Sequence, residues 1–97
     1  METYVILRRH GFRDGDDLRA AAERSTIEGE QMSDGVRWIR SYVLAEEDGT
    51  LGTVCIYQAT SPEAVLEHAR RAGLPADEVI LSPDTVIVRP DPEPAAV

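Results

Sequence analysis

The stretch "VRWIRSYVLAEEDGTLGTVCIYQA", residues 36–59, decides the fold class of this 97-residue chain. Two runs rich in β-branched, aromatic and aliphatic residues, 36–45 and 51–59, flank the acidic segment EEDGT. An Asp-Gly pair between two such runs is a strong signal for a β-hairpin. The stretch therefore predicts two consecutive antiparallel strands.

A helix is predicted directly after this hairpin, in "SPEAVLEHARRAG" (61–73). Ser61 suits the N-cap, Pro62 suits the first helical position, and Gly73 suits the residue just beyond the end. Because these three local signals agree, we expect a helix that begins at Pro62 and ends just before Gly73.

The residues before the hairpin predict a strand and another helix. The apolar run 3–7 is typical of a strand, and a helical period then extends from Asp16 to just before Gly35. Glycine at that point suits a left-handed helix cap. One face of this helix carries mainly small residues, namely Leu18, Ala21, Ala22, Ser25, Gly29 and Met32. Ile27 projects from the opposite face, where a monomer would expose it.

The last part of the chain, "DEVILSPDTVIVRP" (77–90), holds two apolar runs separated by Ser82-Pro83-Asp84. Because proline cannot donate a hydrogen bond to a neighbouring strand, we expect an edge or bulged strand here. The polar, proline-rich tail 91–97 is expected to be disordered. The resulting β-α-β-β-α-β order predicts an α+β, ferredoxin-like domain over residues 1–90, with both helices on one face of an antiparallel sheet.

Both faces of this sheet are predicted to be apolar. In the first hairpin strand we assign Val36, Trp38, Tyr42 and Leu44 to one side and Ile39 and Val43 to the other. In the second we assign Cys55 and Tyr57 to one side and Val54 and Ile56 to the other. An antiparallel sheet without a polar face needs a second cover. We therefore predict a homodimer that packs sheet against sheet, as in dimeric α/β barrels.

Composition excludes several classes of partner. The formal net charge is −8, whereas nucleic acids and anionic membranes are bound by basic surfaces. The apolar runs are far shorter than the roughly 20 residues that a membrane-spanning helix needs. A single cysteine cannot form an internal disulfide, and the N-terminus lacks the order of a signal peptide. A cytoplasmic protein that binds neither nucleic acid nor membrane is expected.

The candidate site residues lie on the hairpin and the second helix. His68 lies about 60–90° from the centre of the apolar stripe of its helix, at the border between helix, sheet and solvent. Position alone favours a half-buried packing histidine over a ligand. Tyr42 and Tyr57 on adjacent strands, with Trp38, could line a cavity that binds a cofactor. Cys55 by itself is typical of a small buried hydrophobe.

Other polar features are interpreted as solvent-exposed. His10 follows the first strand in "RRHGFRDG", and EEDG (46–49) lacks the ligand pattern of a calcium loop. The sequence contains no Gly-rich phosphate loop, cysteine pair, HExxH motif or nucleophile elbow. Common enzyme signatures are therefore absent.

Four segments, SYV (41–43), CIYQATSPEAV (55–65), EHARRAGLPADEV (67–79) and VIVRP (86–90), resemble a bacterial family of small ferredoxin-like domains of unknown function. Some members of that family are described as nickel-binding proteins. The resemblance implies a homodimer that binds a divalent transition metal, with nickel as the ion, and that has no established catalytic activity.

The same resemblance implies roles for individual residues. The family's helix histidine maps onto His68, its first hairpin tyrosine onto Tyr42, and its cysteine and second tyrosine onto Cys55 and Tyr57. We therefore predict His68 and Cys55 as metal ligands, because imidazole suits nickel and other donors can complete an octahedral shell. Leu7 stands where relatives often carry an acidic residue, which predicts weaker binding if that carboxylate helps to hold the metal.

Three functions follow as hypotheses. The first is non-enzymatic binding of nickel by a small cytoplasmic dimer. The second is a small-molecule or enzymatic cleft of the dimeric α/β-barrel type, monooxygenase-like or isomerase-like, lined by Trp38, Tyr42, Tyr57, Cys55 and His68. The third is a module that serves only in assembly.

Overall fold

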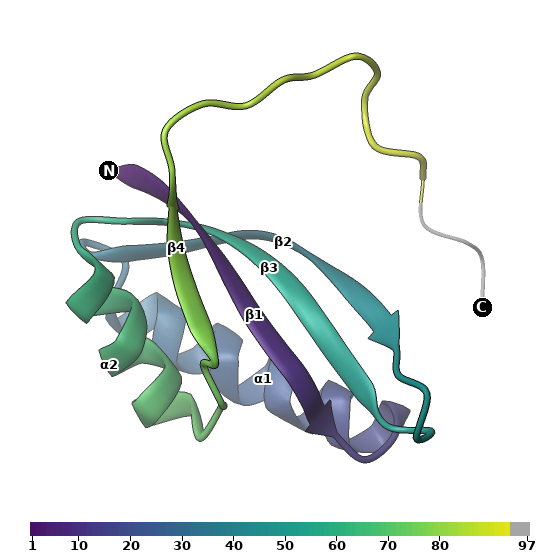
Figure 1. Cartoon of the computed structure of the whole chain (residues 1–97). Coiled ribbons are helices and arrows are strands. Elements are labelled where there is room, and N and C mark those ends of the chain that lie inside the picture. The colour runs from purple at the N-terminus through teal and green to yellow at the C-terminus, as the bar shows by residue number, and fades with distance from the viewer. Residues whose placement is uncertain (94–97) are drawn as a thin grey trace.

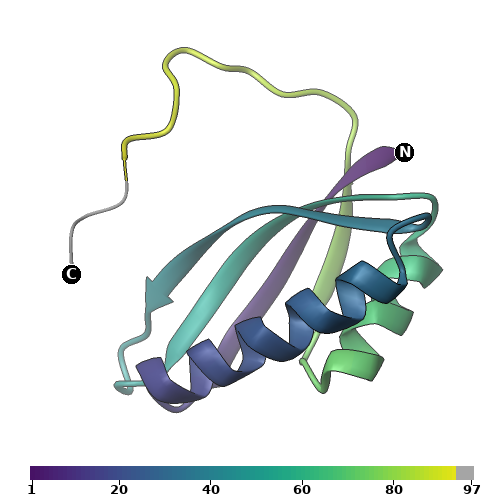
Figure 2. The same ribbon diagram turned by 180° about the vertical axis from the view of Figure 1, so that it is seen from behind.

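The computed structural model describes residues 1–93 and contains the six predicted elements in the predicted order. They are β1 (Glu2–Phe12), α1 (Gly15–Gln31), β2 (Val36–Ala45), β3 (Leu51–Ala59), α2 (Pro62–Ala72) and β4 (Glu78–Ser82). The strands form one antiparallel sheet in the order β2-β3-β1-β4 (Figure 1). Both helices cover the same face of the sheet (Figure 2). This arrangement is compatible with the ferredoxin-like fold.

The hairpin and α2 form from local signals, as predicted. The Ser61 hydroxyl accepts a hydrogen bond from the Ala64 amide at 3.1 Å, and Pro62 opens the helix. Gly73 caps the other end in a left-handed conformation, with φ 68°. In the hairpin, Gly49 has φ 88°, a value that glycine adopts without strain.

Helix α1 is shorter than predicted at its C-terminal end. It begins after Asp14, whose carboxylate accepts from the Asp17 amide at 2.9 Å, and it ends with Met32 as cap. The predicted left-handed cap at Gly35 is wrong, because Gly35 does not adopt a positive φ. The chain instead turns through hydrogen bonds from Gly35 and Val36 to the Met32 carbonyl, at 2.8 and 2.9 Å.

Strand β1 is longer than the predicted 3–7 and is irregular near its end. Its pairing with β3 is interrupted between Arg8 and Phe12, and His10 within this segment has φ 52°. Opposite the irregularity, a Cβ atom at Gly52 would lie 2.7 Å from the Arg8 carbonyl oxygen. Glycine is therefore required where β3 approaches the backbone of β1 this closely.

Strand β2 contains a β-bulge that corrects one face assignment. Trp38 pairs with Tyr57, but Arg40 pairs with Ile56, so Ile39 is an extra residue in β2. Because an extra residue reverses the alternation, Tyr42 lies on the sheet face opposite Trp38. The predicted placement of Tyr42 and Leu44 with Trp38 is wrong for this reason, and Val43 lies on the helix-covered face instead.

The second apolar run of the C-terminal region is not part of the sheet. Strand β4 ends at Ser82, and Val86, Ile87 and Val88 are 88%, 76% and 80% exposed. Pro83 follows the strand at once, which explains why pairing with β1 stops there. Residues 94–97 of the predicted disordered tail lie outside the described residues.

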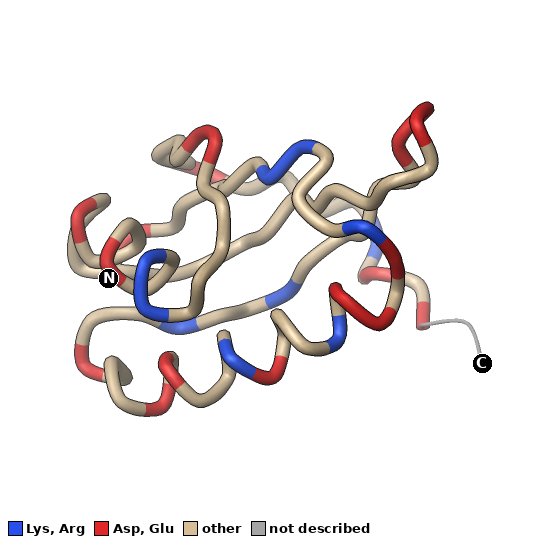
Figure 3. The backbone as a smooth tube through the Cα atoms, turned by 90° about the horizontal axis from the view of Figure 1, so that it is seen from below, with Lys and Arg blue, Asp and Glu red and all other residues tan. Residues whose placement is uncertain are grey.

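The core lies between the helices and the sheet. It consists of Tyr4, Ile6, Val36, Cys55, Tyr57, Ala59 and Val65. The other sheet face, hereafter the outer face, carries the partly or fully exposed side chains of Val5, Leu7, Tyr42, Val54, Ile56 and Ile80. In the backbone view of Figure 3, Asp and Glu outnumber Arg around the molecule. Neither described helix is long and apolar enough to cross a membrane.

Candidate functional site

His68 is buried rather than half-exposed, with 1% of its surface accessible. The predicted border position is wrong because α1 packs along that flank of α2. The imidazole Nε2 lies 3.0 Å from the Ser25 carbonyl oxygen, which can only accept, so Nε2 carries a proton. Within residues 1–93 the other nitrogen, Nδ1, has no hydrogen-bond partner. Burial lowers the pKa of His68, which keeps the ring neutral near pH 7.

The Cys55 thiol lies at the centre of a polar cluster within the core. Its sulfur accepts hydrogen bonds from Arg8 Nη1 and the Ser41 hydroxyl, both at 3.0 Å, and it donates to the Thr53 hydroxyl at 3.3 Å. Trp38 Nε1 donates to the same Ser41 hydroxyl at 2.8 Å. Cys55 is therefore held by polar contacts, and does not act only as a small hydrophobe.

Arg8 is a buried cation without an acidic partner in the described part of the chain. It is 1% exposed, and its Nε donates to the Pro75 carbonyl at 2.6 Å. Its Nη2 atom has no partner in residues 1–93. A buried guanidinium that lacks a counterion is costly, so this arrangement calls for an explanation.

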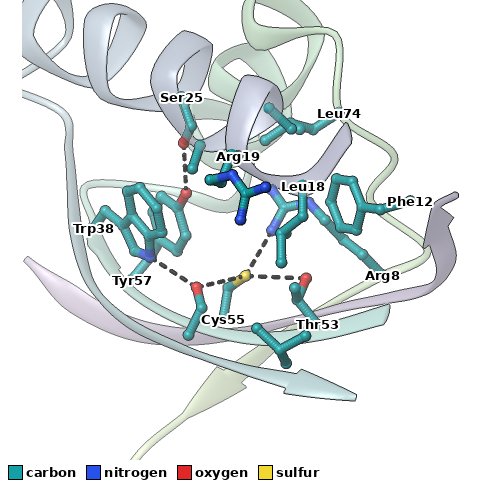
Figure 4. Close-up of a pocket in the computed structure, with 14 residues that line it drawn as sticks. Arg8, Phe12, Leu18, Arg19, Ser25, Trp38, Thr53, Cys55, Tyr57 and Leu74 are labelled. Atoms are coloured by element: carbon teal, nitrogen blue, oxygen red, sulfur yellow. Dashed lines mark hydrogen bonds between the residues drawn. The ribbon is translucent and has the colours of Figure 1, made fainter. Parts of the chain in front are cut away.

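A cavity of about 310 Å³ lies between α1 and the sheet, beside this cluster. Figure 4 shows Trp38 and Tyr57 on one side of the Cys55 sulfur, with Arg8 and Phe12 on the other. The Trp38 and Tyr57 rings are stacked, with centroids 6.3 Å apart. The cavity is lined by Arg8, Phe12, Leu18, Arg19, Ala21, Ala22, Ser25, Trp38, Ser41, Val43, Thr53, Cys55, Tyr57 and Leu74.

The structure brings together only some of the residues predicted to form a cofactor site. Trp38, Tyr57 and Cys55 line the cavity, whereas Tyr42 donates from the outer face to Asp91 at 2.7 Å. The Tyr57 hydroxyl hydrogen-bonds to the Ser25 hydroxyl at 3.2 Å, and burial raises the pKa of Tyr57. The Tyr57 ring also packs against His68, with centroids 5.5 Å apart.

A second polar group, which no sequence motif indicates, lies at the β2–β3 hairpin. This hairpin-tip group consists of His10, Glu46 and Asp48. His10 Nε2 lies 3.0 Å from a Glu46 oxygen, and His10 Nδ1 lies 3.0 Å from an Asp48 oxygen. The side chains of His10 and Asp48 are about half-exposed, whereas that of Glu46 is buried, so solvent and ions reach the group through His10 and Asp48.

The two carboxylates of this group are held ionised. Hydrogen bonds from Arg9 are the main cause of the lowered pKa of Glu46. Hydrogen bonds from the Thr50 hydroxyl and amide lower the pKa of Asp48 to about 2. The sequence carried no signal for this group, because it depends on the register that brings the end of β1 beside a hairpin 36 residues away.

The described residues contain no complete metal cluster. Within residues 1–93, no three His, Cys, Asp or Glu side chains are arranged to hold one ion. His10 lies between its two carboxylates, so each ring nitrogen faces a single acidic ligand. Leu7 lies on the outer face opposite Val54, so an acidic residue at that position would point away from Cys55.

One family model matches most of the chain. The family model described as "Nickel responsive protein SCO4226-like" matches residues 4–81. The crystal structure of SCO4226 from Streptomyces coelicolor A3(2) superposes with a TM-score of 0.68 at 21% sequence identity, covering 87% of this chain and 99% of that one. That likeness supports the fold. Comparison with curated proteins gives no significant match.

Proposed function

We propose that this chain, which belongs to the SCO4226-like family of nickel responsive proteins, binds a divalent transition metal ion, nickel first, through the hairpin-tip group. The observation that carries the proposal is the His10 imidazole, which lies 3.0 Å from a carboxylate oxygen at each ring nitrogen. Imidazole and carboxylate are donors that nickel accepts, and water can complete an octahedral shell.

The charge and access of this group favour a cation. Glu46 and Asp48 are both ionised near neutral pH, and His10 and Asp48 are half-exposed, whereas the Glu46 carboxylate is buried and paired with Arg9. His10 with one carboxylate supplies two protein ligands, so the remaining positions fall to water or to a second copy of the chain. Two protein ligands predict modest affinity, which suits a protein that responds to the ion or buffers it.

The two interior ligands predicted from sequence remain alternatives. Cys55 lies 3.0 Å from the Arg8 guanidinium, and a metal ion on that sulfur would meet a positive charge. His68 has the features of a ligand in one respect, since it donates from Nε2 to a carbonyl and leaves Nδ1 free to bind. That nitrogen is buried, however, and an ion would have to displace packed atoms to reach it.

Native mass spectrometry with nickel and with magnesium tests the assignment. We expect the protein to take up a fixed number of nickel ions in preference to magnesium, and His10→Ala to abolish that uptake. His68→Ala and Cys55→Ser serve as matched controls and should bind as the wild-type chain does. Loss of uptake in either control with retention in His10→Ala would place the ion in the interior instead. Absence of uptake by the wild-type chain would reject nickel binding.

We also propose that the chain forms a homodimer through the outer face. The apolar side chains of Ile56, Val5 and Ile80 form one row across β3, β1 and β4 there, without a covering helix. Val86, Ile87 and Val88 add a second exposed apolar segment beyond the end of β4. Apolar surface of this kind on a small domain supports association. A dimer formed in this way could also bind metal. If the chain serves only in assembly, we expect a dimer that takes up no nickel.

A further inference from the structure

The buried guanidinium of Arg8 is the feature that neither metal binding nor assembly uses. Arg8 is 1% exposed, and no carboxylate of residues 1–93 forms an ion pair with it. Its contacts to the Pro75 carbonyl and the Cys55 sulfur occupy Nε and one N–H of Nη1. The two N–H groups of Nη2 and the second N–H of Nη1 are left for another acceptor.

The cavity beside this buried edge supplies a place for that acceptor, which reaches Nη2 once the side chains that cover the edge shift aside. Arg8 lines the 310 Å³ cavity, whose size lies at the lower end of the range for small-molecule sites. Arg19 lines it as well, while no described lining residue is Asp or Glu. Arg19 is largely exposed and forms an ion pair with Asp16, so the buried Arg8 is the uncompensated charge that favours an anionic ligand.

The rest of the wall is apolar and aromatic. The stacked Trp38 and Tyr57 rings form one side, and Phe12 and Leu18 face them across the cavity (Figure 4). Such a wall binds a flat hydrocarbon body, whereas it offers little to a compact, strongly hydrated ion. A ligand that matches both parts therefore has one anionic group and an apolar body.

We propose that this cavity binds a small aromatic or aliphatic monocarboxylate, with its carboxylate on the free Nη1–Nη2 edge of Arg8 and its apolar body between Trp38 and Phe12. A carboxylate matches the planar guanidinium edge through two parallel hydrogen bonds. A phosphate monoester carries more charge than one buried guanidinium offsets, and the cavity supplies few further donors. The proposal is independent of the nickel site, which lies at the hairpin tip.

The fluorescence of Trp38, the single tryptophan of the chain, reports binding directly. Three probes share a phenyl ring and differ in the attached group: phenylacetate, phenylacetamide and phenyl phosphate. We expect saturable quenching by phenylacetate, with an affinity at least about tenfold higher than that of the neutral amide or the phosphate. This factor corresponds to about 1.4 kcal/mol, close to the lower end of the range of about 1.5–3 kcal/mol for hydrogen bonds to charged groups.

Two variants separate the Arg8 contact from overall charge. Arg8→Lys keeps the charge but removes the two-nitrogen edge, so we expect at least about a tenfold loss of phenylacetate affinity. Arg13→Gln removes one positive charge from a side chain that is 87% exposed, and should bind phenylacetate as the wild-type chain does. The wild-type ranking of the three probes does not depend on either variant folding.

Alkylation of Cys55 gives a second readout that needs no variant. Iodoacetate and iodoacetamide both form a carbon–sulfur bond to the thiolate and release iodide, but only iodoacetate carries a carboxylate. We expect the ratio of the iodoacetate rate to the iodoacetamide rate to be at least about tenfold higher in the folded chain than in the chain unfolded in urea. Phenylacetate should slow both reactions by occupying the cavity.

Three results would overturn the proposal. Equal affinity for phenylacetate and phenylacetamide would show that the cavity binds apolar ligands without distinguishing an anionic group from a neutral one. Tighter binding of phenyl phosphate would assign the site to phosphorylated ligands. No saturable binding of any probe, together with equal alkylation ratios in the folded and unfolded chains, would remove the site altogether.

Discussion

The backbone carbonyl oxygen of Ser25 in α1 lies 3.0 Å from Nε2 of His68 in α2. This hydrogen bond connects the two helices at a point where both side chains are buried. The Ser25 hydroxyl simultaneously contacts the Tyr57 hydroxyl of β3 at 3.2 Å. One residue of α1 therefore links the other helix to the sheet.

The lowered pKa of His68 predicts that stability depends on pH. Burial is the main cause of the shift, so the unfolded chain binds a proton that the folded chain does not. The free energy of unfolding has its full value above the unfolded pKa of about 6.5 and decreases as the pH falls below it. His68→Gln should remove this part of the slope, because glutamine can donate to Ser25 without titrating. Urea denaturation between pH 7.5 and 5.5 gives the pH dependence of the free energy of unfolding for the wild-type chain and for His68→Gln. Identical slopes for the two proteins would contradict the prediction.

The contact between Ser25 and Tyr57 predicts a measurable coupling energy. Ser25→Ala and Tyr57→Phe each leave one buried hydroxyl without its partner, while the double variant leaves none. We expect a coupling of about 1 kcal/mol between the two substitutions, as is typical of a buried hydrogen bond. A double-mutant cycle by chemical denaturation tests this value, and strictly additive effects would show that the two hydroxyls do not interact.

The close approach at Gly52 predicts that even a methyl group is not tolerated there. A Cβ atom at this position would lie 2.7 Å from the Arg8 carbonyl oxygen. Gly52→Ala should lower the free energy of unfolding by about 1–3 kcal/mol, because backbone atoms must move apart. Gly15→Ala is the matched control, since the nearest atom there is the flexible end of Arg19 at 3.8 Å. Equal midpoints of urea denaturation for Gly52→Ala and Gly15→Ala would argue against a steric clash with the Arg8 carbonyl oxygen.

The outer face predicts which surface holds two copies together. Ile56 lies in β3, one of the two central strands, so Ile56→Glu should convert the proposed dimer into a monomer by placing a charge near the centre of the outer face. Ile27→Glu provides the control, because Ile27 is 56% exposed on α1, away from that face. Native mass spectrometry gives the subunit count. If Ile27→Glu dissociates the dimer and Ile56→Glu does not, the interface lies on the helices and not on the outer face.

The elements that could be predicted from sequence are those fixed by local signals. Ser61, Pro62 and Gly73 determine where α2 begins and ends, and Gly49 determines the hairpin turn. These residues act within one turn of the chain, so a short stretch is sufficient. Together with the apolar runs of the strands, they were sufficient to predict the order of elements, whereas the family resemblance rested on four matching segments of sequence.

The features that sequence did not reveal depend on contacts between distant segments. The position of Tyr42 was missed because one extra residue at Ile39 leaves the apolar pattern of β2 almost unchanged. The burial of His68 depends on α1, which the helical wheel of α2 does not contain. Arg8 lies just beyond the predicted strand 3–7, whereas β1 continues to Phe12 and places the Arg8 guanidinium within the core. The hairpin-tip group similarly requires the register of β1 and β3.

The β-bulge at Ile39 also affects how relatives of this chain are aligned. In this chain Ser41 pairs with Cys55 because Ile39 is an extra residue. For a homologue that lacks the extra residue, the alignment must place a one-residue gap at Ile39 so that the residue facing its cysteine is matched with Ser41. An ungapped alignment would instead match residues from opposite faces of the sheet along the rest of β2. Substitution patterns computed from such an alignment would mix the cavity-lining position at Val43 with the outward position at Tyr42.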